Sequence, residues 1–198
     1  MSEKKAPSAR ERILKAASYL FYLEGIRAIS VDAIAERAGV TKKTLYYHFA
    51  SKDDLIAAYL ALRDQPNLAA FARWLAEAEG GLPERMEAFF LRIAEAGRHP
   101  KWKGCGFLRT TAELANLPGH PARKVGAGHK KKVEAWLAEE FRQEGIAPPE
   151  GLARQIAVLI DGAFSAMLVH RDAGYARDTG QAARTLVEAA LAHAVAAG

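Results

Sequence analysis

Residues 30–52 read SVDAIAERAGVTKKTLYYHFASK, and this stretch is more informative than the rest of the chain together. Small and branched apolar residues recur at helical spacing in its first half, which predicts a short helix with one apolar face. Gly39 supplies the backbone freedom that ends this helix, and Thr41 is a good N-cap for a second helix that runs to about Phe49. Two short helices joined by a tight turn of this kind indicate a helix-turn-helix.

The second helix has two contrasting sides. At about 100° per residue, Leu45 and Phe49 point the same way and face the core. Lys43 and Tyr47 then lie on the opposite side. The major groove of DNA admits an α-helix, and lysine donates there to guanine edges while tyrosine and threonine offer hydroxyls and apolar surface. We therefore predict a recognition helix; the alternative, a core helix with aromatic packing, would have to bury several lysines and tyrosines.

The start of the following helix is a predicted phosphate contact. Ser51 and Asp54 have the spacing of a capping box, which places Lys52 in the first turn of a helix. Free backbone N–H groups and the helix dipole favour a phosphate at that position. His48 can donate to a phosphate from the end of the recognition helix, or it is a surface residue without a partner. For Tyr46, the alternative to a DNA contact is a ring that packs partly in the core.

The order VDAIAERAGVTKKTLYYHFASKDDL, residues 31–55, resembles the TetR family of bacterial one-component transcriptional regulators. The resemblance extends back through residues 9–23 and forward to about residue 63, with looser echoes in GCGFLRTTAE and LIDGAF. It implies an all-α fold, with an N-terminal three-helix helix-turn-helix domain over residues 1–64 and a C-terminal helical ligand-binding and dimerisation domain over residues 65–198. It also implies a homodimer that binds a pseudo-palindromic double-stranded DNA operator and releases it when a small-molecule effector binds.

The resemblance assigns DNA-contact roles position by position. Lys43 lies at the variable position that tunes the choice of sequence, so it marks specificity without revealing the operator. The predicted DNA-binding residues are Ser30, Thr41, Lys42, Lys43, Thr44, Tyr46, Tyr47, His48 and Lys52.

Composition sets bounds that agree with this interpretation. The chain has 198 residues, half of them apolar, which is enough for a core in one or two domains. Its formal net charge is only +5, although the sequence pI near 9.3 favours anionic partners. The single cysteine, Cys105, excludes an intrachain disulfide and fits a reducing cytoplasm. The charged start lacks the apolar run of a signal peptide, and we expect no membrane span. Lys4, Lys5 and Arg10 form either a basic arm that reaches DNA or a solvated tail.

The remainder of the chain is predicted to be helical, with breaks at proline and glycine. We expect Pro66 to end the helix that starts at Ser51 and to mark the joint between the domains. Beyond that joint the expected helices are 68–79, 83–97, 107–117, 122–144, 151–172 and 178–196, with a loop over 99–106.

The last two expected helices have the broad apolar faces that are typical of a dimer interface. The first of them is apolar nearly all round, so it must bury one face in its own domain and another against something else. Two such helices from each subunit can form a four-helix interface, and an intrachain core is the alternative. A two-fold dimer also lets a small helix-turn-helix read paired half-sites. The predicted interface residues are Ile156, Leu159, Ile160, Ala163, Met167, Leu186, Val187, Ala190 and Leu191.

The middle of the chain is aromatic and indicates room for a hydrophobic or aromatic effector between helices. For each aromatic residue taken alone, plain core packing is the alternative. Asp161 is an ionisable residue in an apolar helix; it either orients an effector or, as we favour, pairs structurally. The predicted ligand-binding residues are Phe71, Trp74, Phe89, Phe90, Trp102, Phe107, Thr110, Thr111, Glu113, Trp136, Phe164 and Met167.

Motifs for catalysis or metal binding are missing from the sequence. The six histidines are scattered, with no H-E-x-x-H, C-x-x-C or G-x-S-x-G pattern, and a cluster of His99, Cys105, His120 and His129 has little support. We therefore predict no enzyme, no cofactor and no metal; the lysine run at 130–132 is most simply a solvated helix face. The function predicted from the sequence is a ligand-responsive repressor. The alternatives are an architectural DNA binder whose C-terminal domain only dimerises, and an enzyme or carrier on the same fold.

Overall fold

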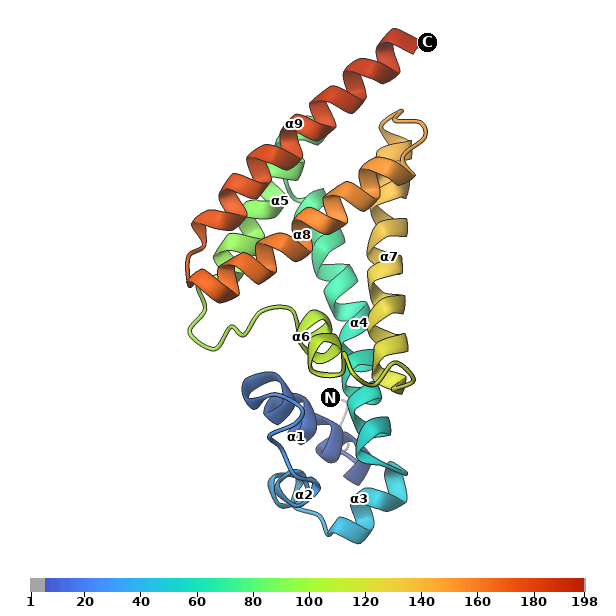
Figure 1. The fold of residues 1–198 in the computed structure, drawn as a ribbon, viewed down its shortest axis with the longest axis vertical. Coiled ribbons are helices and arrows are strands. Elements are labelled where there is room, and N and C mark those ends of the chain that lie inside the picture. The colour runs from blue at the N-terminus through green and yellow to red at the C-terminus, as the bar shows by residue number, and fades with distance from the viewer. Residues whose placement is uncertain (1–5, 198) are drawn as a thin grey trace, which may run out of the picture. The chain divides into compact units, whose positions relative to one another are not determined.

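A computed structural model describes residues 6–197, and within that range every regular element is a helix. The predicted all-α fold is thereby confirmed. Lys4 and Lys5 of the proposed basic arm lie outside the described residues. The helices, labelled in Figure 1, are α1 (Ala9–Glu24), α2 (Val31–Ala38), α3 (Lys42–His48), α4 (Lys52–Ala76), α5 (Leu82–Gly97), α6 (Gly106–Glu113), α7 (Pro121–Gln143), α8 (Glu150–His170) and α9 (Gly174–Ala197).

The chain divides into two compact units. The first comprises the residues up to Arg63 together with Gly106–Gly126, and the second comprises Asp64–Cys105 together with the residues from Ala127 onward. The cut after Arg63 falls beside the domain boundary expected at residue 64. Residues 106–126, which we expected in the second domain, belong instead to the first unit, so α6 and the start of α7 pack with the helix-turn-helix.

The first unit is built on the apolar stripe of α1. This helix begins at a capping box, in which Ser8 Oγ accepts the N–H of Glu11 at 3.3 Å and the carboxylate of Glu11 accepts the N–H of Ser8 at 2.7 Å. Phe21 of α1 meets Tyr59 of α4 edge to face, with ring centroids 5.7 Å apart. The buried apolar residues of α1 to α4 in this unit include Ile13, Leu14, Ala17, Leu20, Phe21, Ile34, Leu45, Phe49, Leu55 and Tyr59.

The helix α4 runs unbroken through Pro66, so the expectation that Pro66 ends it is wrong. A proline in a helix interior costs about 3 kcal/mol, because it lacks an N–H group and clashes with the preceding turn. Beyond Pro66 the same helix buries Phe71 and Leu75, which are 7% and 1% exposed. Each of these burials contributes about 1.5–3 kcal/mol, so together they offset the cost of the proline.

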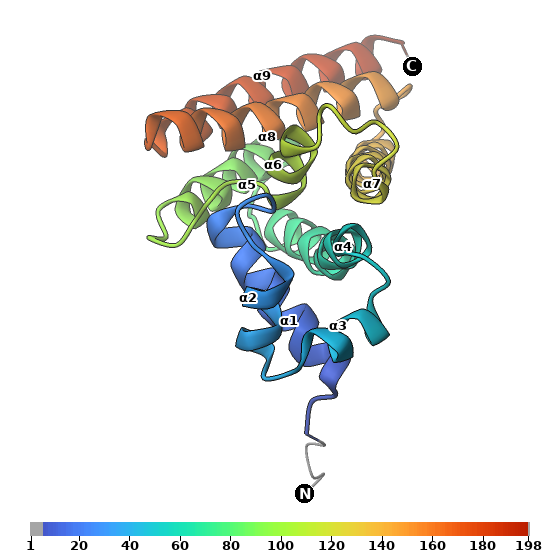
Figure 2. The same ribbon diagram turned by 60° about the horizontal axis from the view of Figure 1, so that its bottom comes forward.

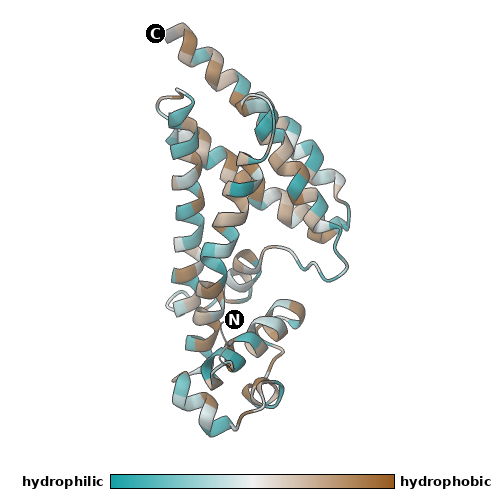
Figure 3. Ribbon diagram, turned by 180° about the vertical axis from the view of Figure 1, so that it is seen from behind, coloured by the Kyte–Doolittle hydropathy of each residue, from teal (hydrophilic) through white to brown (hydrophobic). Residues whose placement is uncertain are grey.

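The second unit is a stack of long helices in which α9 packs along α5 and α8 (Figures 1 and 2). The approach of α9 to α5 is close: a Cβ at Gly180 would lie 2.9 Å from Cβ of Phe90. Arg184 of α9 adds ion pairs to Glu84 and Glu87 of α5 at 2.8 and 3.0 Å. Brown and teal residues alternate along the helices in Figure 3, as expected of amphipathic helices around a core.

The helix α8 is the one described helix that is long and apolar enough to span a membrane by length and composition. Its apolar character has another explanation in this fold. Ile156, Ile160 and Ala163 of α8 are each at most 2% exposed and belong to the core of the second unit.

Candidate nucleic-acid interface and effector pocket

The turn between α2 and α3 has the expected local chemistry. Ser30 caps α2, with its Oγ accepting the N–H of Ala33 at 3.1 Å. Gly39 ends α2 in the left-handed conformation at φ 63°, which glycine adopts without strain. Thr41 then caps α3 by accepting the N–H of Thr44 at 3.1 Å. The observed helices α2 and α3 therefore begin and end where the cap residues predict.

The two sides of α3 differ as the periodicity predicts. Leu45 is fully buried and Phe49 is 5% exposed, whereas Tyr46 and Tyr47 are 44% and 84% exposed. The ring of Tyr47 meets His48 edge to face, with ring centroids 5.1 Å apart. Most of Tyr47 is nevertheless exposed on a helix that is anchored from behind, which leaves its hydroxyl and much of its ring available to a partner.

The remaining polar residues of α3 are also at the surface. Lys42 and Lys43 are exposed and Thr44 is half-buried. Thr41 Oγ1 and Thr44 Oγ1 lie 2.9 Å apart, so these two hydroxyls share a hydrogen bond across the first turn. The structure thus brings Thr41 to His48 together on one short helix and its cap.

Lys42 forms an ion pair that the sequence analysis missed. Its Nζ lies 3.0 Å from Oδ2 of Asp32 on α2, and both side chains are more than half exposed. The hydrogen bond to Asp32 raises the pKa of Lys42, so the lysine stays charged. Exposed pairs of this kind contribute little to stability, and a phosphate can replace the carboxylate of Asp32.

Lys52 occupies the first turn of α4 as predicted. Ser51 Oγ accepts the N–H of Asp54 at 3.0 Å and donates to its carboxylate at 2.8 Å. Lys52 is half-buried; burial lowers its pKa, and the carboxylates of Asp53 and Glu113 act in the opposite direction.

Arg10 lies beside the end of the recognition helix. Its guanidinium carbon is 5.1 Å from the centroid of the Phe49 ring, a cation–π distance. Of the three residues of the proposed basic arm, Arg10 is the one that the structure describes.

The four predicted effector residues of α6 lie in the first unit. Phe107 and Thr110 are 1% and 3% exposed. Thr111 packs against Gly126, where a Cβ would lie 2.8 Å from Thr111 Oγ1. Glu113 is bound to the backbone between α1 and α2 through Ile26 and Arg27. These four residues therefore belong to the first unit, with Phe107 and Thr110 buried and Thr111 and Glu113 half-buried, and not to the aromatic cluster of the second unit.

The aromatic residues of α4, α5 and α7 pack against one another. Phe89 is fully buried and its ring centroid lies 5.2, 5.6 and 6.0 Å from those of Phe71, Phe90 and Trp136. Trp74 joins the same group at 6.3 Å from Phe89. Edge-to-face and tilted contacts of this kind are favourable core packing, which is the alternative that the sequence left open for each ring.

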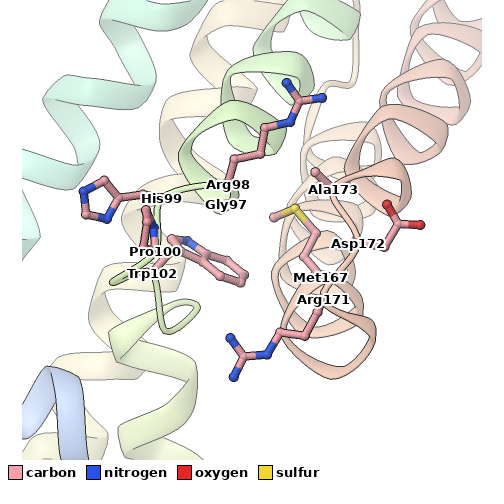
Figure 4. A pocket seen from close by; sticks show the side chains of 9 residues that line it. All are labelled: Gly97, Arg98, His99, Pro100, Trp102, Met167, Arg171, Asp172 and Ala173. Atoms are coloured by element: carbon pink, nitrogen blue, oxygen red, sulfur yellow. The ribbon is translucent and has the colours of Figure 1, made fainter.

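A pocket of about 330 Å³ opens in the second unit between the end of α5 and the end of α8 (Figure 4). The indole of Trp102 points towards Met167, and it stacks on Phe164 with ring centroids 6.3 Å apart. Met167 approaches Gly97 so closely that a Cβ there would lie 3.0 Å from its sulfur. Two of the predicted effector residues, Trp102 and Met167, therefore line this pocket, and a third, Phe164, stacks on Trp102. The lining residues are Gly97, Arg98, His99, Pro100, Trp102, Met167, Arg171, Asp172 and Ala173.

The lysine run of α7 is not a purely solvated face. Lys130 pairs with Asp161 of α8, and its Nζ lies 3.7 Å from Sγ of Cys105. Lys132 pairs with Asp64 of α4. Asp161 therefore has an intrachain partner. Within residues 6–197, no group of three or more His, Cys, Asp or Glu side chains is arranged to hold a metal ion.

The predicted interface residues divide between the core and the surface. Ile156, Ile160, Ala163, Met167 and Val187 are at most 2% exposed in the single chain and pack in its own core, out of reach of a partner. Leu159, Leu186, Ala190 and Leu191 are half-buried at the edge of that core.

Two valines on the outward side of α8 were not predicted from the sequence. Val158 and Val169 are 65% and 73% exposed. Val158, Leu159 and Leu186 line a groove of about 580 Å³ with Gly151, Arg154 and Gln155. This outward side of α8 therefore presents apolar side chains to a partner.

Known proteins resemble the chain in sequence. Residues 13–59 match the family model described as bacterial regulatory proteins, tetR family. The regulator SrpR of Pseudomonas putida is 33% identical over 98 residues, which cover 50% of this chain and 44% of SrpR. The repressor KstR2 of Mycobacterium tuberculosis is 33% identical over 144 residues, covering 72% of this chain and 71% of KstR2. The chain thus matches less than half the length of SrpR, but more than two thirds of KstR2.

Solved structures agree over nearly the whole chain. The TetR-family regulator SCO4454 of Streptomyces coelicolor superposes with a TM-score of 0.77 at 31% identity, covering 94% of this chain and 95% of that one. A regulator of Streptomyces avermitilis superposes with a TM-score of 0.77 at 32% identity, covering 93% and 98%. These proteins are transcriptional regulators and not enzymes. With its capped helix-turn-helix and these relatives, the chain belongs to the TetR family of bacterial transcriptional regulators.

Proposed function

We propose that the chain is a cytoplasmic repressor that binds a pseudo-palindromic operator as a homodimer and leaves it when a small apolar or aromatic effector binds. The observation that supports this most is the outward side of α3. There Lys43 and Tyr47 stand exposed on a helix whose opposite side, Leu45, is fully buried. Such a helix fits the major groove, with phosphate contacts from Ser30 and Lys52 at the helix starts on either side.

The outward side of α8 and α9 supports the proposal that the chain forms a homodimer. Val158 and Val169 expose large apolar side chains, next to the groove lined by Leu159 and Leu186. Pairing this surface with its copy forms a four-helix interface and sets two recognition helices for paired half-sites.

The pocket at Trp102 and Met167 supports the proposal that the chain binds a small-molecule effector. Its wall contains an indole and a thioether, together with the polar side chains of Arg98, His99, Arg171 and Asp172, which can fix the orientation of a small molecule. In this proposal the effector acts on the DNA contacts through α4, which carries Lys52 near one end and the buried Phe71 near the other. For strong release the effector must prefer the non-binding state by several kcal/mol.

The test is a titration against the DNA upstream of the chain's own gene, beside a scrambled duplex, at roughly 50 and 200 mM salt. Specific binding should exceed non-specific binding by at least about a thousandfold and persist at the higher salt while both weaken. If the upstream site and a duplex selected from a random pool both bind no better than the scrambled duplex, the repressor proposal fails. The architectural DNA binder then takes its place.

A further inference from the structure

The carboxylate of Glu113 fastens α6 to the turn between α1 and α2. Glu113 Oε2 accepts the backbone N–H groups of Ile26 at 3.0 Å and of Arg27 at 3.2 Å. These residues lie 87 and 86 positions apart from Glu113 in the sequence, so the contact is tertiary. Hydrogen bonds to an ionised carboxylate are about twice as strong as neutral ones.

The backbone of the turn is shaped to receive this carboxylate. Gly25 ends α1 at φ 90°, and a Cβ at this position would lie 3.2 Å from Glu113 Oε1. A side chain at Gly25 would therefore strain the backbone and crowd the carboxylate. The turn and Glu113 form one tight contact.

A second residue of α6 holds the same end of α1. Arg109, one helical turn before Glu113, donates from its guanidinium to the carbonyl oxygen of Tyr22 at 2.7 Å. The carbonyl groups in the last turn of a helix lack helical partners and carry partial negative charge, which a guanidinium complements. Arg109 thus binds the last turn of α1, and Glu113 binds the N–H groups that follow it.

The turn held by Glu113 leads directly into α2. Ile26 and Ile29 are 2% and 6% exposed and anchor the turn in the core, and Ser30 then caps α2. The direction in which α2 leaves the turn sets the position of Ser30 and, through Gly39, of α3. A change in the turn is therefore transmitted to the predicted DNA contacts.

We propose that Glu113 is a positioning residue for operator binding: from α6 it fixes the α1–α2 turn and thereby the placement of α2 and α3 on DNA. This inference rests on the proposed operator binding and adds a residue outside the helix-turn-helix to the DNA-reading unit. The side chain acts through the backbone of Ile26 and Arg27 and itself contacts no DNA.

The experiment compares the wild-type chain of 198 residues with Glu113→Gln, Glu113→Ala and the control Glu134→Gln. Glu134 pairs with Lys131 on α7 in the second unit, so its substitution removes the same charge without touching the turn. The probes are the duplex that the wild type enriches from a random pool and a scrambled duplex of equal length. We expect Glu113→Ala to weaken operator binding by about tenfold or more, Glu113→Gln to weaken it less, and Glu134→Gln to leave it within about twofold.

The scrambled duplex separates positioning from charge. Removing a negative charge strengthens non-specific binding slightly, so the operator-to-scrambled ratio should fall for the Glu113 variants and stay constant for Glu134→Gln. A loss of equal size on both duplexes, or a ratio unchanged in Glu113→Ala, would overturn the inference. A wild type that does not discriminate between the duplexes would overturn the proposed function as well.

Amide hydrogen exchange gives a readout that does not depend on DNA or on a folded alanine variant. In the wild type the amides of Ile26 and Arg27 should be protected, and in Glu113→Gln they should exchange at least about tenfold faster. The amides of Leu45 in α3 and of the C-cap residue Phe49, which donate to the carbonyl oxygens of Thr41 and Leu45, should keep their protection. Rapid exchange at Ile26 and Arg27 in the wild type would contradict the proposed fastening.

Discussion

Asp32 at the start of α2 and Lys42 at the start of α3 form a 3.0 Å ion pair across the helix-turn-helix. The pair holds a lysine at the predicted DNA surface against a carboxylate that DNA phosphates would repel. Binding DNA therefore requires Lys42 to leave Asp32, or the carboxylate to remain close to a phosphate. The ion pair with Asp32 thus competes with a contact between Lys42 and a DNA phosphate.

Replacing Asp32 with Asn should strengthen binding to operator and scrambled DNA alike, by about two- to tenfold at low salt. Loss of the carboxylate frees Lys42 and removes repulsion from phosphates. Affinity for both duplexes at two salt concentrations checks this. The control Asp178→Asn makes the same charge change on α9, and an equal gain in that variant would show that net charge alone is responsible.

Stability should fall in mild acid because of His129. This side chain is 3% exposed, and its Nδ1 lies 2.8 Å from Oδ1 of Asp64. Burial lowers the pKa of His129, with Lys130 and Lys132 adding to the effect and Asp64 opposing it. The unfolded chain therefore takes up a proton near pH 6.5 while the folded chain does not, and stability is lost as the pH falls below about 6.5.

The measurement for His129 is urea unfolding at about pH 7.5 and pH 5.5 for the wild type and His129→Gln. The free energy of unfolding should fall more steeply with acid in the wild type, by up to about 1.4 kcal/mol per pH unit, than in the variant. Equal slopes would show that His129 does not titrate differently on folding. Burial by itself raises the pKa of Asp64, but hydrogen bonds from Lys132 and His129 lower it overall, so its own contribution is lost only at much lower pH.

Two glycines should respond to alanine in opposite directions. At Gly180 a Cβ would lie 2.9 Å from Cβ of Phe90 and 3.2 Å from the carbonyl oxygen of Glu87, so Gly180→Ala forces α9 away from α5. We expect it to destabilise the chain by about 1–3 kcal/mol. At Gly128 of α7 nothing lies within 4 Å, and alanine there should stabilise by about 0.5–1 kcal/mol. Thermal or urea unfolding of both variants checks the pair; a stabilising Gly180→Ala would contradict the packing of α5 on α9.

Substitution of Val158 tests the proposed dimer interface. Because this side chain is 65% exposed in the single chain, Val158→Asp should leave the fold intact but place a charge in the interface. We expect a shift from dimer to monomer in light scattering and a loss of operator binding. The control Leu91→Asp puts the same charge on an exposed leucine of α5 and should remain dimeric. A Val158→Asp variant that stays dimeric would move the interface to another surface.

The helix-turn-helix could be predicted because its signals are local in the sequence. The other features depend on tertiary packing, which the sequence pattern does not report. Caps and helical periodicity act over a few residues, so they predicted the buried Leu45 and the exposed Tyr47 correctly. In α8, which is apolar nearly all round, periodicity does not distinguish the inward Ile156 from the outward Val158. The role of Glu113 depends on backbone 86 and 87 positions away, which no local pattern reports.

If the outward side of α3 reads DNA sequence, removing the side chain of Tyr47 should weaken binding to the operator. Tyr47 is 84% exposed, so Tyr47→Ala should leave the unfolding free energy unchanged. The measurement is the affinity of Tyr47→Ala for the selected operator, beside the wild type and the control Tyr175→Ala on α9. If α3 reads the operator, Tyr47→Ala should lose about ten- to a hundredfold in affinity for the operator and change little on scrambled DNA. Unchanged operator affinity in Tyr47→Ala would contradict the reading of the operator by α3.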